Sequence, residues 1–135
     1  MITYQKEPQI SLAEFKLILI DSGLGERRPL ENDGLLNQMI LGSNAFVTAR
    51  LDGQLVGLLR GLSDYCYRTF VADLAVSKSF QRQGIGKEII RFTRQLAPEA
   101  RIFLFSAENA EGFYQKLGFH LHERCYQLKP GEMLF

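Results

Sequence analysis

The stretch Asp73-Leu74-Ala75-Val76, followed after a polar turn by Gln81-Arg82-Gln83-Gly84-Ile85-Gly86-Lys87, decides how this chain is interpreted. The first four residues end an apolar run, and the two glycines open a strongly patterned helix. Free N–H groups and the positive end of the helix dipole meet at a helix N-terminus, so a pyrophosphate can bind there through backbone alone. The pattern therefore predicts a phosphate-binding loop between a strand and a helix, although two glycines can also serve only to shape a turn.

Two other glycine-rich nucleotide motifs fail on their spacing. A P-loop requires a glycine where Gln81 stands, and a Ser or Thr after Lys87, where the chain has Glu88. A dinucleotide fingerprint requires a third glycine at the position of Ile89. The sequence therefore predicts neither an ATP or GTP site nor a Rossmann domain.

The segment before the loop predicts two helices and then three strands. Ser11 begins a capping box and Gly23 supplies a left-handed stop, while Asn32 or Asp33 can cap a second helix that Gly42 closes. The predicted strands are 45–51 and 54–62, which flank the turn-forming Asp52-Gly53, and 67–76. Together these strands predict an antiparallel meander.

The segment from the loop onward predicts a helix over 84–97 ended by Pro98, a strand over 101–106, a helix over 110–117 ended by Gly118, and strands from Phe119 onward. The order αα-βββ-α-β-α-β predicts an α/β (α+β) fold in which helices cover a mixed, largely antiparallel sheet. The length of 135 residues predicts a single domain over 1–135.

The overall composition argues against several classes of partner. Sixteen basic and fifteen acidic residues leave a net charge of +1, which gives no general attraction for nucleic acid or an anionic membrane. The opening residues lack a secretory pattern, so we expect a cytoplasmic protein. Cys66 and Cys125 have no zinc-ligand spacing, so we expect reduced structural thiols and no metal.

The motif Gln81-x-x-Gly84-x-Gly86 after the Leu-Ala-Val strand end resembles the coenzyme A pyrophosphate loop of the GNAT (GCN5-related N-acetyltransferase) superfamily. The element order resembles that fold over almost the whole chain, and the part from Leu59 to Phe119 is similar to arylalkylamine or serotonin N-acetyltransferases. The resemblance implies acetyl-CoA as cosubstrate, held where the strand ending near Val76 splays from the next strand. The implied cofactor-binding residues are Leu74, Ala75, Val76, Gln81, Arg82, Gln83, Gly84, Ile85, Gly86, Lys87, Asn109 and Tyr114.

The segment from Phe113 to Phe119 resembles the family's FYxxxGF motif, which makes Tyr114 the leading catalytic residue. The resemblance implies that Tyr114 protonates the departing sulfur as a general acid, while a backbone N–H near Val76 faces the carbonyl oxygen. Alternatively, Tyr114 only packs in the core. Many relatives carry an Asn at the place of Ala107, and the nearby Asn109 could contact the coenzyme or cap a helix.

Asp73 is the second catalytic candidate, because its carboxylate could bind the amine or lead its proton to water. It could equally cap or brace the splayed strand. Phe70 stands where some histone-modifying relatives carry a glutamate base, which argues against that mechanism here. Further candidates for acceptor binding, each with an ordinary structural alternative, are Asp64, Tyr65, Tyr67, Arg27, Arg28, His120 and His122.

These features predict an acetyl-CoA-dependent N-acetyltransferase that acts on a primary amine of a small molecule, with proteins or peptides as a further acceptor class. A noncatalytic acyl-CoA sensor that uses Tyr114 only for packing is the alternative. A purely structural or partner-binding domain would not bind coenzyme A selectively. The resemblance also makes a homodimer an option.

Overall fold

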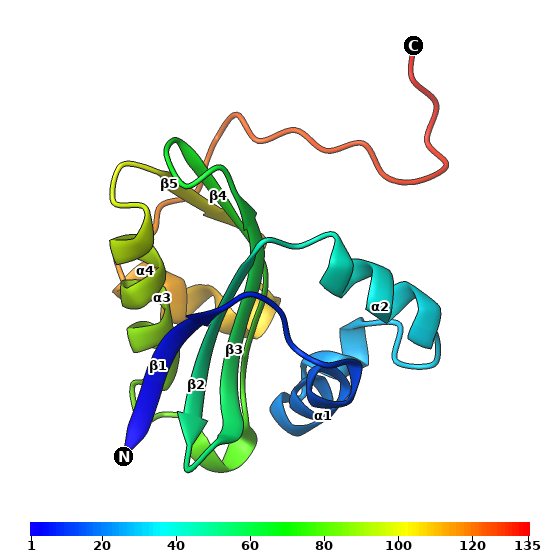
Figure 1. Ribbon diagram of the computed structural model, residues 1–135. Helices are drawn as coiled ribbons and strands as arrows, with labels where there is room; N and C mark the ends of the chain where they lie inside the picture. The colour runs from blue at the N-terminus through cyan, green and yellow to red at the C-terminus, as the bar shows by residue number, and fades with distance from the viewer. The chain divides into compact units, whose positions relative to one another are not determined.

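The computed structural model describes all 135 residues and divides them into two compact units, Met1–Phe105 and Ser106–Phe135. The first unit contains a five-stranded sheet in the order β1-β2-β3-β4-β5 (Figure 1). The strands are β1 (Ile2–Glu7), β2 (Ala45–Leu51), β3 (Gln54–Ser63), β4 (Arg68–Val76) and β5 (Arg101–Leu104). The first four pair antiparallel and β5 pairs parallel to β4, which confirms the predicted mixed, largely antiparallel sheet.

Three helices complete the first unit: α1 (Leu12–Ser22), α2 (Asp33–Leu41) and α3 (Ile85–Leu96). Ser11 Oγ accepts the N–H of Glu14 at 3.1 Å and starts α1, which Gly23 ends at φ +86°. Asn32 Oδ1 caps α2 by accepting the N–H of Leu35 at 3.0 Å. The predicted helix starts are therefore confirmed, with Asn32 rather than Asp33 as the second cap.

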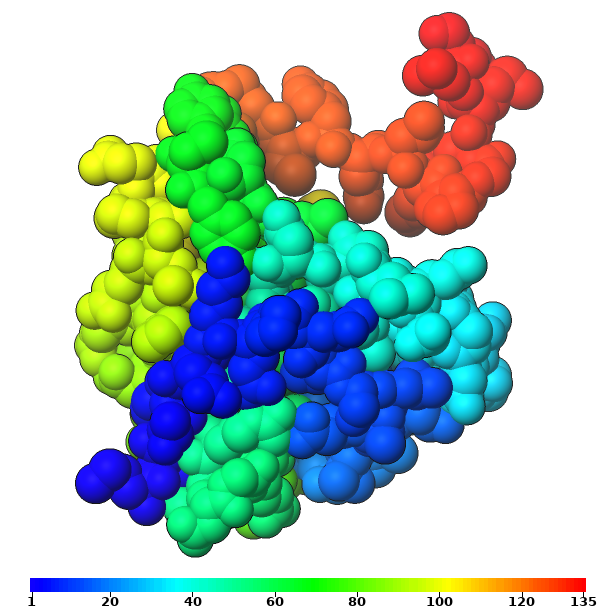
Figure 2. Space-filling model, in the orientation of Figure 1, coloured from blue at the N-terminus to red at the C-terminus, as the bar shows by residue number.

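The core consists of two apolar clusters, one on each face of the sheet. On one face α1 and α2 bury Phe15, Leu19, Leu36, Ile40, Phe46 and Leu58, and on the other α3 buries Val47, Val56, Leu59, Val71, Ile85 and Ile89. In Figure 2 the dark blue side chains of β1 lie between α3 on the left and the α1 and α2 pair on the right. A Cβ on Gly57 would come 2.9 Å from Ile89 Cδ1, so glycine there lets α3 approach β3 closely.

The first strand is a feature that sequence analysis missed. β1 pairs with β2 from Ile2 opposite Leu51 to Glu7 opposite Phe46. Ile2 and Tyr4 alternate with polar residues and pack on the α3 side of the sheet. That alternation was the available signal, but the partner strand lies about forty residues further along the chain.

The second unit contains the 3₁₀ turn η3 (Glu108–Ala110) and the short helix α4 (Glu111–Lys116). The prediction of strands from Phe119 onward is wrong, because residues 119–135 contain no strand. The backbone hydrogen bonds of this segment are local, such as the one from Cys125 N to His122 O at 3.4 Å. A strand requires a neighbour that satisfies its backbone groups, and this segment has none.

Cys66 and Cys125 are free, and both are exposed. Their role as structural thiols stays a prediction. None of the helices combines the length and apolarity needed to cross a bilayer. The single domain over 1–135 and the cytoplasmic location stay predictions.

Candidate functional site

The sheet opens between β4 and β5. β5 pairs with β4 only from Arg68 to Val71, whereas β4 continues to Val76 with β3 as its only partner. The N–H of Ser77 bonds Val56 O at 2.9 Å, toward β3, and successive residues of a strand point their backbone groups to opposite edges. The backbone N–H and C=O of Val76 therefore face the side that β5 has left open.

A β-bulge lies where this opening begins. The register of β3 against β4 shifts so that Arg60 pairs with Asp73 and Gly61 with Val71, which leaves Ala72 as an extra residue. Arg28, from the loop that follows η1 (Leu24–Arg27), donates from Nη2 to the Ala72 carbonyl at 3.1 Å. The carbonyl that the bulge leaves outside the ladder is thereby satisfied.

Asp73 is held by two guanidinium groups. It is 2% exposed, and its carboxylate accepts Arg28 Nε at 2.7 Å and Arg60 Nε at 2.5 Å. Arg60 is itself buried and also donates to Ser43 Oγ at 2.9 Å. Because both carboxylate oxygens already bind arginines, the geometry favours the bracing alternative for Asp73 over proton transfer. Sequence analysis missed Arg60, although a charge inside an apolar strand was a signal.

The predicted phosphate loop, residues 81–87, has a backbone conformation that is typical of anion-binding loops. It follows the 3₁₀ turn η2 (Lys78–Phe80), and the left-handed Arg82 (φ +65°) and Gly84 (φ +84°) alternate with ordinary residues. The first helical bond of α3 runs from Glu88 N to Gly84 O at 3.0 Å, and the N–H groups of 82–87 have no acceptor within the protein. Such runs of convergent N–H groups at a helix start bind anions.

Gln81 links this loop to the open strand. Its Nε2 donates to Val76 O at 2.8 Å, and a longer bond of 3.3 Å reaches Ser22 O at the end of α1. The predicted cofactor residues Leu74, Ala75 and Val76 thus lie directly beside the loop residues. The side chain of Gln81 itself holds the backbone in place, which leaves ligand contact to the N–H groups that follow.

In the second unit, Tyr114 lies on α4. Its ring packs edge-on against Phe113 and Phe119, with centroids 5.0 and 5.5 Å away, and its hydroxyl has no hydrogen-bond partner in the protein. Burial raises the pKa of Tyr114 above its ordinary value, so the phenol holds its proton at neutral pH. Asn109 lies in η3 and does not cap α4, because Ala110 is the cap residue and no side chain bonds there.

The loop between β3 and β4 is shaped by Asp64. Its Oδ1 accepts the N–H groups of Cys66, Tyr67 and Arg68 at 3.0, 2.7 and 3.0 Å, and these bonds hold the pKa of Asp64 well below its usual range. Tyr65 donates its hydroxyl to Asn44 O at 2.7 Å. Asp64 therefore has a structural role, because its carboxylate holds the backbone of this turn.

The other acceptor candidates are placed as follows. Arg27 ends η1, and Arg28 binds Asp73 in place of the predicted solvated loop or acceptor mouth. His120 and His122 lie in the strandless segment 119–135, where His122 Nδ1 accepts the N–H of Arg124 at 3.0 Å, so the expected strand positions are wrong. No group of three or more His, Cys, Asp or Glu side chains is arranged to hold a metal ion.

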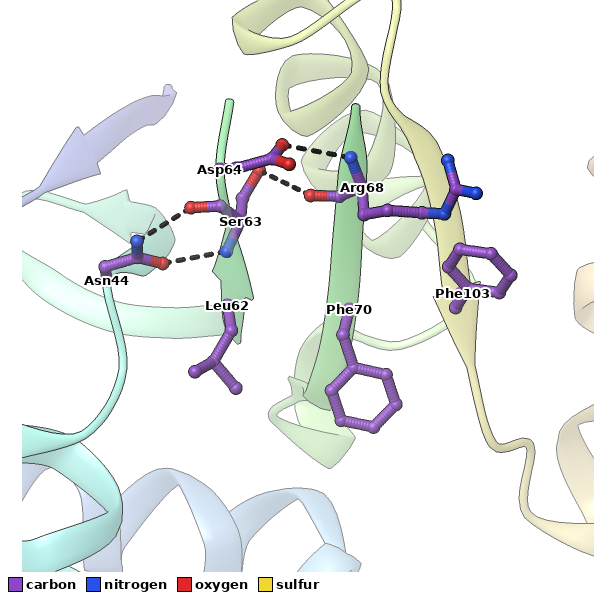
Figure 3. Close-up of a pocket in the computed structure, with 7 residues that line it drawn as sticks. All are labelled: Asn44, Leu62, Ser63, Asp64, Arg68, Phe70 and Phe103. Atoms are coloured by element: carbon purple, nitrogen blue, oxygen red, sulfur yellow. Dashed lines mark hydrogen bonds between the residues drawn. The ribbon is translucent and has the colours of Figure 1, made fainter. Parts of the chain in front are cut away.

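A pocket of about 470 Å³ adjoins the Asp64 loop (Figure 3). Its lining residues come from β3, β4 and β5 and from the positions just before β2 and just after β3, and are Asn44, Leu62, Ser63, Asp64, Arg68, Phe70 and Phe103. Sequence analysis missed Leu62 and Phe103 as site residues. The only available signal was that both are apolar side chains near strand ends.

Comparison with known proteins places this architecture in a family. Residues 15–119 match the model of the acetyltransferase (GNAT) family. The chain is 31% identical over 121 residues to GCN5-related N-acetyltransferase 3, chloroplastic, of Arabidopsis thaliana, covering 87% of this chain and 47% of that protein. The chain spans about half the length of the curated relatives it matches.

Solved structures agree with this match. A GNAT-family acetyltransferase from Streptococcus pneumoniae TIGR4 aligns with a TM-score of 0.77 and 28% identity over 96% of each chain. An aminoglycoside N-acetyltransferase in complex with CoA shares the fold at 16% identity, with a TM-score of 0.71 over 97% of this chain and 95% of that one. Because the family model covers most of its residues, this chain belongs to the acetyltransferase (GNAT) family.

Proposed function

We propose that this protein transfers an acetyl group from acetyl-CoA to a primary amine of a small molecule, by direct attack in a ternary complex. The observation that carries the proposal is the run of N–H groups at 82–87 without acceptors, tied by Gln81 to the open edge of β4 at Val76. The family match supports the reaction class, and the fold relative solved with CoA supports the cofactor.

The first unit provides two complementary surfaces for the coenzyme. The N–H groups from Arg82 to Lys87 suit a pyrophosphate, and a Cβ on Gly84 would meet no atom within 4 Å, so the approach is open. The open edge of β4 suits the amides of the pantetheine arm, which would replace the missing strand partner. Leu74 and Val76 offer their backbone groups there, while those of Ala75, between them, face β3. Asn109 is a further proposed contact.

Acetyl-CoA supplies an acyl group activated as a thioester. A neutral amine attacks the thioester carbon, so that the C–N bond forms as the C–S bond breaks and the amine proton passes to water. The Val76 N–H is proposed to stabilise the charge that develops on the carbonyl oxygen. Tyr114 is proposed to donate its hydroxyl proton to the departing sulfur, a role that its unpartnered and protonated hydroxyl supports.

Release of free thiol over a panel of amines tests this proposal, with CoA binding measured alongside by calorimetry. We expect Tyr114→Phe to lower kcat by about a hundredfold or more while CoA binding persists, because only the proton donor is lost. Tyr126→Phe, at an exposed tyrosine of the same unit, is the matched control and should leave kcat unchanged.

The same experiment separates the alternatives. Tight CoA binding without amine-dependent thiol release would favour the noncatalytic sensor, and absence of CoA binding would contradict the loop assignment itself. Turnover with peptides but not with small amines would show that the acceptor is a protein or peptide. The homodimer stays a prediction.

A further inference from the structure

Helix α1 has an apolar face that is turned away from the sheet. Phe15 and Leu19 are fully buried on the sheet side of the helix. On the opposite side, Leu17 and Ile20 are each 55% exposed, and Ala13, one turn before Leu17, is exposed as well. The spacing of four and three residues places Ala13, Leu17 and Ile20, here called the outer row, in one line along the helix.

Helix α3, on the other face of the sheet, has the ordinary surface of a helix that covers a sheet (Figure 1). It buries Ile85 and Ile89. Its exposed face carries the charged residues Lys87, Arg91 and Arg94. Such a charged face is what solvent normally requires of an amphipathic helix. The outer row of α1 is therefore not explained by the packing of α1 on the sheet.

Two charges flank the outer row at the positions that pair in a parallel coiled coil. Lys16 directly precedes the leucine of the row, and Asp21 directly follows its isoleucine. With Leu17 and Ile20 as positions a and d of a heptad, the two charges occupy positions g and e. In a parallel pair of α1 helices, Lys16 of each copy would lie beside Asp21 of the other. An antiparallel pair would instead bring like charges together.

Asp21 has no cation to balance its charge within its own chain. It lies in the last turn of α1, where the helix dipole disfavours a carboxylate, and no basic residue shares that turn. None of the salt bridges of the protein includes it. Lys16 binds Asp33 at 2.8 Å, but both side chains are partly exposed there, so Lys16 can change partners at small cost. A second copy of α1 would supply the cation that Asp21 lacks.

We propose that the outer row is the contact surface of a homodimer, in which the α1 helices of two copies of this chain pack in parallel about a twofold axis. Leu17 and Ile20 of the two copies interdigitate, which removes their apolar surface from water. Two Lys16–Asp21 pairs, one on each side, fix the parallel direction. Because α1 has only 11 residues, the contact is small and the dimer dissociates in the micromolar range. The inference is independent of the proposed acetyl transfer.

Sedimentation equilibrium from micromolar to submillimolar protein tests the contact. We expect the wild-type protein to dimerise in this range and Leu17→Glu/Ile20→Glu to stay monomeric, because the variant places charges inside the contact. Leu41→Glu, the same change at a 66% exposed leucine of α2, is the matched control and should dimerise like the wild type. Urea unfolding should show that both variants are folded. A monomeric wild-type protein, a dimeric double variant or a monomeric control would each overturn the inference.

The flanking charges test the direction of packing. Asp21→Lys should raise the Kd of the dimer about tenfold, because it places two lysines side by side at each edge of the contact. Lys16→Glu/Asp21→Lys, which exchanges the two signs, should restore the wild-type Kd. The difference between Asp21→Lys and the wild type should shrink at high salt. A wild-type Kd in Asp21→Lys, or no recovery in the exchanged variant, would overturn the parallel pairing.

Discussion

At the residue scale, Asp73 is the buried carboxylate that joins the bulge of β4 to the rest of the fold. Arg60 reaches it from β3 and Arg28 from the connection between α1 and α2. Removing one member of such a group leaves buried charge without compensation, which costs far more than loss of an exposed pair.

Asp73→Asn should therefore lower the free energy of unfolding by about 3 kcal/mol, measured with urea. Asp33→Asn is the control, because its ion pair with Lys16 is exposed and its loss should cost less than about 1 kcal/mol. A variant at Asp73 with wild-type stability and greatly reduced kcat would instead identify a proton-transfer residue.

A comparison of Gly84 with Gly53 separates loss of CoA binding from the general effect of backbone strain. Both have φ +84°, and a Cβ on either would meet no protein atom within 4 Å. Alanine at each position should therefore cost about 1 kcal/mol of stability. Only Gly84→Ala should also weaken CoA binding, by about tenfold, because its methyl group stands beside the N–H groups of the loop. Equal CoA affinities in the two variants would contradict the proposed pyrophosphate site.

At the element scale, one arginine ties together β1, β2 and α1. Arg50 on β2 donates to Glu7 at 2.8 and 3.1 Å and to Glu14 at 2.7 and 3.1 Å. The Arg50 hydrogen bonds, aided by Thr48, lower the pKa of Glu7 from 4.5 to about 2 against the opposing effect of burial. The network anchors the edge strand β1 and fixes α1 over the sheet.

This lowered pKa predicts a pH dependence of stability. The charged Glu7 stabilises the fold above pH 4.5, and its contribution is lost as pH falls from 4.5 to about 2. Urea unfolding should show Glu7→Gln less stable than wild type by about 1 to 2 kcal/mol at pH 7, and by much less at pH 2. Glu99→Gln, at an exposed carboxylate in the turn before β5, is the control. Its difference in stability from the wild type should not change between pH 7 and pH 2.

At the scale of the whole molecule, the proposed CoA-binding surfaces and the proposed proton donor belong to different units. Both core clusters, the phosphate loop and the edge of β4 belong to Met1–Phe105, whereas Tyr114 belongs to Ser106–Phe135. A chain that ends at Phe105 should therefore unfold cooperatively and still bind CoA, but should release no thiol above background. Calorimetry and the thiol assay check this, and loss of cooperative unfolding would show that the first unit depends on the second.

Much of the fold could be predicted because its signals are local. Ser11 and Asn32 cap helices through bonds to residues three positions away, and Asp52-Gly53 closes the β2–β3 hairpin with both residues at positive φ. The loop before α3 was equally predictable, because glycine at Gly84 permits the left-handed turn that frees the following N–H groups. Such features depend on a few neighbouring residues.

By itself, then, the sequence determined the helices α1 to α4, the hairpin, the glycine-containing loop before α3 and the family. Tertiary structure alone decided three further features, because each depends on residues far apart in the chain. β1 needed β2 as a partner, Asp73 received Arg28 from 45 residues away, and Leu62, Phe70 and Phe103 met only when three strands came into register. The segment after Phe119 has strand-like composition but no partner, and so it forms no strand.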